Sequence, residues 1–340
     1  MPAGAEPLPD HQTSFERRWG HLTRPHVRAL AWLLDAPDLL DPAAPYWHGR
    51  IATLGAVNAA DAAWLAALEH DPAPLVAALG SRFYSRLGLY AEKLMAFYYA
   101  QRGMLAAHGL QVRMPRPKGG QQTVGEFDFL LDEPAGLRHI EFASKFYLLD
   151  GHAANGDFDV LVGPNLADTL GRKMRKIFAQ QLALGGHPAA QLALQQAGLR
   201  PVVAAQALVK GWLFHPPGMD AVIPGITPGH CRGTWRTLGD FAAVEEEGCF
   251  VVMPRLLWLA PLKIRATPDD AAVPSALSRA ELADVLALQF ATDASPVMVA
   301  SVRQEGEWLL EEGRAFLVPD GWPAQAALRR ANDARTSATD

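Results

Sequence analysis

Residues 125–130 read Gly-Glu-Phe-Asp-Phe-Leu, and residues 139–146 read His-Ile-Glu-Phe-Ala-Ser-Lys-Phe. In both runs polar and apolar side chains alternate, which is the pattern of a β-strand with one polar and one apolar face. Glu126 and Asp128 share a face of the first strand. The corresponding face of the second strand carries His139, Glu141, Ala143 and Lys145. If the two strands pair, the carboxylates converge beside the lysine.

This pattern predicts a site for a divalent metal. Charged groups within apolar strands are costly to bury unless they bind a partner. A cation that prefers oxygen ligands would neutralise the carboxylates of Asp128 and Glu141. Such a metal can activate water and stabilise the charge that develops on a phosphate during phosphodiester hydrolysis, and a lysine can support the nucleophile or the transition state. We therefore expect Mg²⁺ or Mn²⁺ at Asp128 and Glu141, with Lys145 beside it.

The residues around these two runs predict an α/β core. A helix is expected over 81–104, where Leu87, Ala91, Leu94 and Tyr98 form one apolar stripe. Extended runs at 110–114, 125–131 and 138–149 follow, separated by glycine and proline turns. We then expect a helix over 166–184 capped by Asn165, a short helix over 189–197 and a buried strand over 201–214. The resulting order, αβββαβ, predicts a mixed central sheet.

The flanking segments divide the chain into a core and additions. We expect a flexible tail over 1–12, a helical N-terminal layer over 13–80, the core over 81–216, a mixed α/β addition over 217–330 and a flexible tail over 331–340. Within the C-terminal addition we expect a strand near 250–253, a helix over 279–290, and a hairpin that pairs 297–302 with 308–318.

A wider set of motifs accompanies the two strands. It comprises Arg86-Leu87-Gly88, Glu92, Gly125-Glu126-Phe127-Asp128, Glu141 to Tyr147, Gly163-Pro164-Asn165 and Trp258-Leu259-Ala260-Pro261. The two acid-bearing strands and the preceding glutamate-bearing helix resemble the PD-(D/E)XK phosphodiesterases, which include restriction enzymes and Holliday-junction resolvases. The wider set resembles an uncharacterised bacterial family assigned to that superfamily, over most of the chain. The resemblance implies a restriction-endonuclease-like core in which Asp128, Glu141 and Glu92 bind the metal and Lys145 is the lysine.

One position departs from the superfamily pattern. The lysine usually lies two residues after the acid, but here that position is Ala143, and the lysine follows at Lys145, about 7 Å further along the strand. Three interpretations stay open: Lys145 is a relocated catalytic lysine, Lys173 on the next helix reaches in, or hydrolysis has been lost. The chain has seven lysines and 24 arginines, so a lysine at 145 or 173 suggests a specific need for that side chain.

Four further residues are candidates for contacting the substrate or a metal ligand: Glu126, His139, Lys173 and Gln181. Gln181 falls within an apolar helical stripe, so its amide needs a buried partner, either a metal ligand or backbone. His139 is either a structural residue at a strand start or a contact to metal or phosphate. The basic run at 172–176 is either a solvated face or a phosphate-binding surface. Glu92 lies off its helix stripe, so a solvated glutamate is its ordinary alternative.

Composition limits the partners and the compartment. With 340 residues and a net charge of −5, the chain can bury a large core but has no global attraction for nucleic acid, so phosphate binding requires a local basic patch. Two cysteines without paired spacing, an N-terminus without a basic start and an apolar run, and no uninterrupted apolar stretch of about 20 residues predict a cytoplasmic protein outside the membrane.

Three functions are consistent with these features. The first is a Mg²⁺- or Mn²⁺-dependent nuclease that hydrolyses DNA or RNA. The second is a nucleic-acid-binding or scaffolding protein that keeps the nuclease-like fold without hydrolysis, favoured by Ala143 and the acidic net charge. The third is a phosphohydrolase of small nucleotides.

Overall fold

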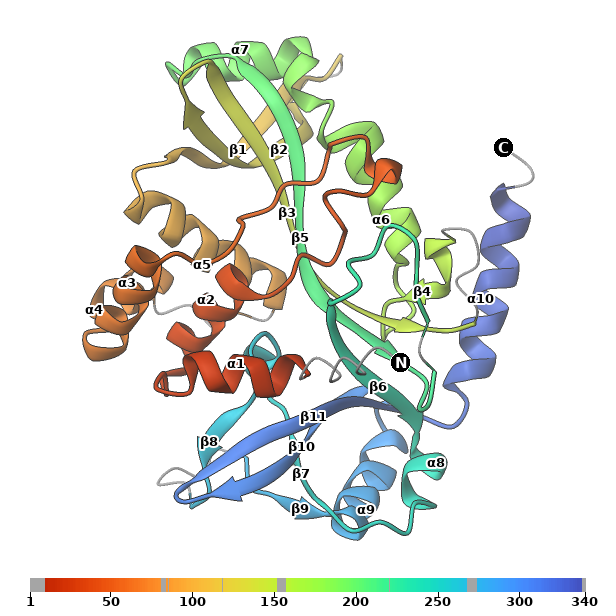
Figure 1. Ribbon diagram of the computed structural model, residues 1–340. Coiled ribbons are helices and arrows are strands. Elements are labelled where there is room, and N and C mark those ends of the chain that lie inside the picture. Colours follow the sequence, from red (N-terminus) through yellow and green to blue (C-terminus); the bar gives the residue numbers. More distant parts are fainter. Residues whose placement is uncertain are drawn as a thin grey trace, which may run out of the picture.

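A single mixed sheet organises the part of the chain described by the computed structural model, which covers residues 10–80, 84, 86–117, 119–151, 157–219, 221–267 and 274–337, the stretch 332–337 as backbone only. Within these residues the sheet has 11 strands. They are β1 (Leu105–Pro115), β2 (Gln121–Glu133), β3 (Gly136–Leu149), β4 (Leu161–Val162), β5 (Val202–His215), β6 (Cys231–Thr237), β7 (Cys249–Val252), β8 (Lys263–Arg265), β9 (Leu277–Ser278), β10 (Val297–Glu305) and β11 (Trp308–Val318). The strand order is β1-β2-β3-β5-β6-β11-β10-β7-β9, with β4 on β3 and β8 on β11. Figure 1 shows a twisted band that runs from β1 and β2 to β10 and β11.

Helices lie along this band. They are α1 (His11–Trp19), α2 (Pro25–Asp35), α3 (Ala59–His70), α4 (Ala73–Leu79), α5 (Leu87–Gln101), α6 (Leu170–Lys176), α7 (Pro188–Gln196), α8 (Leu238–Ala242), α9 (Arg279–Phe290) and α10 (Trp322–Ser337). Shorter helical turns are η1 (Pro45–Trp47), η3 (Phe158–Val160), the π-helical η4 (Ile177–Gln181), η5 (Leu184–Gly186) and η6 (Arg255–Leu257). None of the described helices is both long enough and apolar enough to cross a bilayer.

The half of the sheet that carries the two acids follows the predicted order of elements. α5 precedes an antiparallel meander of β1, β2 and β3, and β5 then pairs parallel with β3. A parallel neighbour requires a crossover connection, which α6, η4, η5 and α7 provide. The predicted sequence of helix, three strands, helices and strand is therefore confirmed, and the protein is α/β with a mixed sheet.

Apolar packing fixes the N-terminal helices against the sheet. The Trp32 ring of α2 stacks on the Trp212 ring of β5, with centroids 6.2 Å apart and an interplanar angle of 6°. Leu94 of α5 and Phe129 of β2 are fully buried in the same cluster. Each such side chain contributes about 1.5–3 kcal/mol on burial, so the helical layer fixes the position of α5 beside β2.

The C-terminal part extends the same sheet. β6 pairs parallel with β5 on one side and with β11 on the other. The predicted strand, helix and hairpin are confirmed as β7, α9 and the antiparallel pair β10–β11. α9 begins at a capping box in which Ser278 and Glu281 bond each other's backbone.

The helix expected over 166–184 differs from the prediction. Its N-cap is Thr169, whose hydroxyl accepts a hydrogen bond from the Arg172 NH at 3.1 Å, and not Asn165. Leu166 adopts a left-handed φ of 54°, and its NH bonds the Gly163 carbonyl at 2.8 Å, so residues 163–166 form a turn. The α-helix ends at Lys176 and continues as the π-helical η4.

Helices extend into the two terminal segments that were expected as flexible tails. Asp10 caps α1, which begins at His11, and the Gln12 side chain is buried, so residues 10–12 are ordered. α10 continues to Ser337. Residues 1–9 and 338–340 lie outside the described residues.

Candidate functional site

Asp128 and Glu141 face each other where the β2–β3 ladder ends. The ladder runs from Glu133 opposite Gly136 to Phe129 opposite Ile140, and Asp128 and Glu141 come next on their strands. Here the Asp128 side chain replaces the backbone carbonyl as acceptor, because its Oδ2 accepts a hydrogen bond from the Phe142 NH at 2.9 Å. The predicted convergence of the two acids is therefore present.

Burial and nearby negative charges raise the pKa of both carboxyls. Burial first, and then the Asp128 charge, raise the pKa of Glu141 to about 8. Burial also raises the pKa of Asp128 to about 6, opposed by the Phe142 NH and reinforced by Glu92. Because the two charges interact, their protons are lost as those of a pair. A cation between the carboxylates would reverse this effect.

Side chains from the crossover helices contact Glu141. Its Oε1 accepts a hydrogen bond from the Gln181 amide, and Lys173 Nζ lies 3.6 Å from the same oxygen. Lys173 Nζ also donates to Gln181 Oε1 at 3.4 Å. Burial lowers the pKa of Lys173, and the Glu141 charge opposes that shift. The Gln181 amide thus points inward as predicted, toward a candidate metal ligand.

The structure distinguishes the surroundings of the two candidate lysines. Lys145 Nζ donates to Asp168 Oδ2 at 2.9 Å, and the Tyr147 hydroxyl donates to the same oxygen at 3.2 Å. Lys173 is the lysine in contact with Glu141. Residue 143 is a buried alanine, so its side chain brings no ammonium to the acids.

Glu92 approaches the acid pair from α5. Its charge raises the pKa of both Asp128 and Glu141, although other causes contribute more. Its Oε1 is hydrogen-bonded to His108 Nε2 of β1 at 2.7 Å. Sequence patterns did not single out His108, because its register opposite Phe129 depends on bulges in β1.

Glu126 and His139 lie at the edges of this group. Glu126 Oε2 accepts a hydrogen bond of 3.4 Å from Gln111, and its charge contributes to the raised pKa of Asp128. His139 is fully buried, and burial lowers its pKa to about 4, so the ring is neutral at pH 7. It packs edge-on against Phe127, with centroids 4.9 Å apart, and its Nε2 lies 3.9 Å from Glu141 Oε2. These contacts fit a packing role for His139.

The acid pair fits a hard divalent cation in its chemistry. In the described part of the chain, no three His, Cys, Asp or Glu side chains are already arranged to hold a metal. The buried Glu141 Oε2 has no hydrogen-bond partner among the described residues, although Oε1 of the same carboxylate has one. Mg²⁺ commonly binds through one or two carboxylates, with water and substrate phosphate as the remaining ligands. Asp128 and Glu141 supply such a pair, with Glu92 beside them.

Comparison with protein families identifies one family over most of the chain. A model described as "Domain of unknown function (DUF1853)" matches residues 28–318. The chain belongs to the DUF1853 family. The DUF1853 match runs from α2 to the end of β11, so it includes the acid pair and the C-terminal part of the sheet. Neither the curated proteins nor the solved structures gave a match.

Proposed function

We propose that the protein is a Mg²⁺- or Mn²⁺-dependent phosphodiesterase that hydrolyses DNA or RNA at the acid pair. The observation that carries this proposal is the meeting of the buried Glu141 carboxylate and the half-buried Asp128 carboxylate, both with a raised pKa, beside the Lys173 ammonium. Perturbed carboxyls with a nearby cationic partner are typical of functional sites. The order of α5, β1, β2, β3, α6 and β5 is also the order expected for a restriction-endonuclease-like core.

Each side chain has a role that follows from its contacts. Asp128 and Glu141 would hold the metal, and Glu92 would complete its surroundings. When bound, the metal would supply an activated water and charge stabilisation at the phosphate. Gln181 holds Glu141 in place through its amide. The Lys173 ammonium would donate to a phosphate oxygen as negative charge develops there.

The crossover helix also offers a local basic surface. Arg172 and Lys176 are exposed on α6, on the same helix as Lys173. A patch of this kind supplies phosphate contacts in a chain whose net charge is −5. The proposed substrate would lie across the exposed side of α6 with one phosphate at Lys173.

Ala143 favours a second candidate, a nucleic-acid-binding protein without hydrolysis. The residue is buried between β3 and the crossover helices and provides no ammonium at the position where the superfamily carries its lysine. In this alternative the acid pair still binds metal, but the bound strand is not cut. A phosphohydrolase of small nucleotides would instead cleave mononucleotides and spare polymers.

A cleavage panel tests these functions. The purified protein is incubated with Mn²⁺ or Mg²⁺ and labelled single-stranded, duplex and branched DNA and RNA, and with mononucleotides. Asp128→Asn and Glu141→Gln are assayed beside Asp132→Asn, a matched control because Asp132 is an exposed acid on the same strand, paired with Arg200. Cleavage by the parent and by the control, but by neither site variant, supports the nuclease. Metal binding measured by calorimetry without any turnover supports the binding protein, and equal cutting by all variants refutes the assigned site.

A further inference from the structure

A cavity lies on the C-terminal part of the sheet, away from the acid pair. It has a volume of about 740 Å³ and opens over β6, β11 and β10. Its floor is made of small residues, namely Thr234, Ser301, Gly313 and Ala315. Thr234 and Ala315 are direct neighbours in the parallel β6–β11 pair. The floor is therefore hollow because short side chains occupy an uncovered stretch of sheet.

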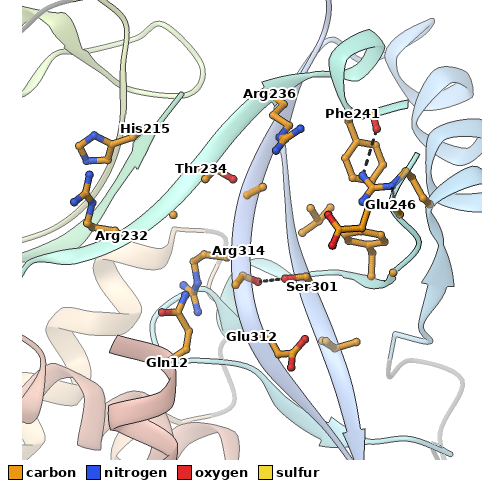
Figure 2. A pocket seen from close by; sticks show the side chains of 18 of the residues that line it. Gln12, His215, Arg232, Thr234, Arg236, Phe241, Glu246, Ser301, Glu312 and Arg314 are labelled. Atoms are coloured by element: carbon orange, nitrogen blue, oxygen red, sulfur yellow. Dashed lines mark hydrogen bonds between the residues drawn. The ribbon is translucent and has the colours of Figure 1, made fainter. Parts of the chain in front are cut away.

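Cationic side chains line one side of this cavity. Arg232, Thr234 and Arg236 alternate along β6 and share one face, and Figure 2 shows them along the same strand at the cavity. Arg236 makes no hydrogen bond or ion pair with any residue that the structure describes. Such a guanidinium has all of its donors available for a ligand.

A second guanidinium is held in place on the adjoining wall. Arg279, the first residue of α9, donates through Nε to the Glu246 carbonyl at 2.8 Å and through Nη1 to the Phe241 carbonyl at 3.3 Å. Its Cζ lies 4.6 Å and 4.9 Å from the ring centroids of Phe241 and Phe250. Two aromatic rings and two carbonyls therefore fix the orientation of Arg279.

The two arginines lie in a cavity whose lining also includes the acidic residues Asp10, Glu246, Glu247 and Glu312. Burial lowers the pKa of Arg279, and repulsion from Arg236 lowers it further, against a weaker opposing effect of Glu246. Arg314, which also borders the cavity, is already bound to the Glu311 carboxylate at 2.7 Å and 2.8 Å. Arg236 and Arg279 thus repel each other across the same cavity, and the Glu246 carboxylate opposes this repulsion only weakly. Figure 2 shows Arg236 and Glu246 at this cavity.

We propose that this cavity binds a phosphate monoester or diphosphate group, held by Arg236, Arg279 and the exposed Thr234 hydroxyl. Guanidinium groups match the geometry of phosphate oxygens and bind them through paired hydrogen bonds. The volume suits a molecule of nucleotide size, and Glu246 accepts a hydrogen bond from an amino or hydroxyl group on the rest of it. The group belongs either to a free nucleotide or to the 5′ end of a nucleic-acid strand.

The cavity is separate from the proposed hydrolytic site. Glu141 pairs with Ala207 at one point of β5, and Thr234 pairs with His215 at another. The eight residue steps from Ala207 to His215 span about 26 Å of strand. A ligand here therefore acts as a second contact or as an effector, and its binding does not depend on the acid pair.

Calorimetry on the full chain tests this proposal. The probes are pyrophosphate, ADP and one oligonucleotide with either a 5′ phosphate or a 5′ hydroxyl, and EDTA is present so that metal at the acid pair plays no part. We expect Arg236→Gln to weaken binding by about tenfold or more and Arg236→Lys to weaken it less, because loss of a charge-assisted hydrogen bond has about that effect. Thr234→Val should weaken binding severalfold. Arg265→Gln is the matched control, since Arg265 is an exposed arginine on β8 paired with Glu307.

The outcomes distinguish a free nucleotide from a strand end, and this cavity from the acid pair. Tighter binding of ADP than of either oligonucleotide supports a free nucleotide, and a preference for the 5′-phosphorylated strand over its hydroxyl form supports a strand end. Circular dichroism confirms that each variant is folded. The proposal is overturned if no probe binds, if Arg236→Gln binds like the parent, or if the two strand forms bind equally while ADP does not. Loss of pyrophosphate and ADP binding in Arg236→Gln would identify this cavity whether or not the acid pair hydrolyses nucleic acid, so failure of the hydrolytic proposal leaves this result intact.

Discussion

Replacing Glu141 by glutamine should stabilise the metal-free protein. The carboxyl is almost fully buried next to Asp128, and these surroundings raise its pKa to about 8. A glutamine has nearly the same shape, still accepts a hydrogen bond from Gln181, and never carries a charge. The substitution therefore removes a cost that the native site imposes on the fold, at the expense of metal binding.

The size of the effect follows from proton linkage. In the unfolded chain Glu141 ionises near pH 4.5, whereas in the fold it holds its proton up to about pH 8. The native state therefore binds more protons between these values, so the stabilising contribution of Glu141 is complete below pH 4.5 and is lost as the pH rises to about 8. At pH 7 the loss is about 3 kcal/mol, at about 1.4 kcal/mol per pH unit. The favourable effect of Lys173 on the Glu141 charge is already contained in this pKa, so we expect a net gain of about 3 kcal/mol in the variant at pH 7.

Urea unfolding at several pH values measures this difference. The free energy of unfolding of Glu141→Gln should equal that of the parent near pH 4.5 and exceed it increasingly up to pH 8, with EDTA present throughout. Glu307→Gln serves as the control, because Glu307 is exposed and paired with Arg265, and it should change stability by less than about 0.5 kcal/mol. A variant that is less stable than the parent at pH 8, or a stability difference that does not vary with pH, would refute the assignment of a buried carboxyl with a raised pKa.

Three further results are expected. Mn²⁺ at about 100 times its dissociation constant should stabilise the parent by about 2.7 kcal/mol in thermal unfolding but leave Asp128→Asn unchanged. The affinity of the parent for Mn²⁺ should rise between pH 6 and 8 as the acids lose protons. An equal response of the variant would contradict the metal site. If the protein cleaves nucleic acid, Lys173→Met should lower kcat about a hundredfold and Lys145→Met should lower it less, because Lys173 is the one of these two lysines that contacts Glu141. The reverse ranking in single-turnover assays would make Lys145 the catalytic lysine. Arg314→Met should cost about 3–5 kcal/mol in urea unfolding, because it leaves the buried Glu311 carboxylate unpaired; a change below about 1 kcal/mol would show that water reaches Glu311.

Much of the fold could be predicted because strand and helix periodicities differ clearly in this chain. The alternation around Asp128 and Glu141 placed both acids on facing strands, and a slip of one residue would have turned an acid toward the apolar side. The hairpin β10–β11 followed from two strand-like runs separated by a short turn. These features depend on neighbours in sequence, so local patterns suffice.

The details of the site depend on contacts that local patterns do not contain. Whether Lys145 or Lys173 meets Glu141 is decided by how the crossover helix lies on the sheet, and that in turn depends on the turn that delays the helix start to Thr169. The partnership of His108 with Glu92 joins a bulged strand to a helix. Tertiary geometry of this kind is fixed by the packing of the whole sheet.

The place of β11 in the sheet has a consequence for biosynthesis. β11 is the last strand among the described residues, yet it lies between β6 and β10 and pairs with both. α1, near the other end of the chain, touches it through the Gln12 amide and Glu311. Synthesis must therefore pass β11 before β6, β10 and α1 acquire their shared neighbour, and until then each of them presents unpaired edges or apolar surface. We expect the nascent chain to depend on chaperones until β11 has emerged, and truncations that remove β11 to aggregate rather than yield a smaller folded protein.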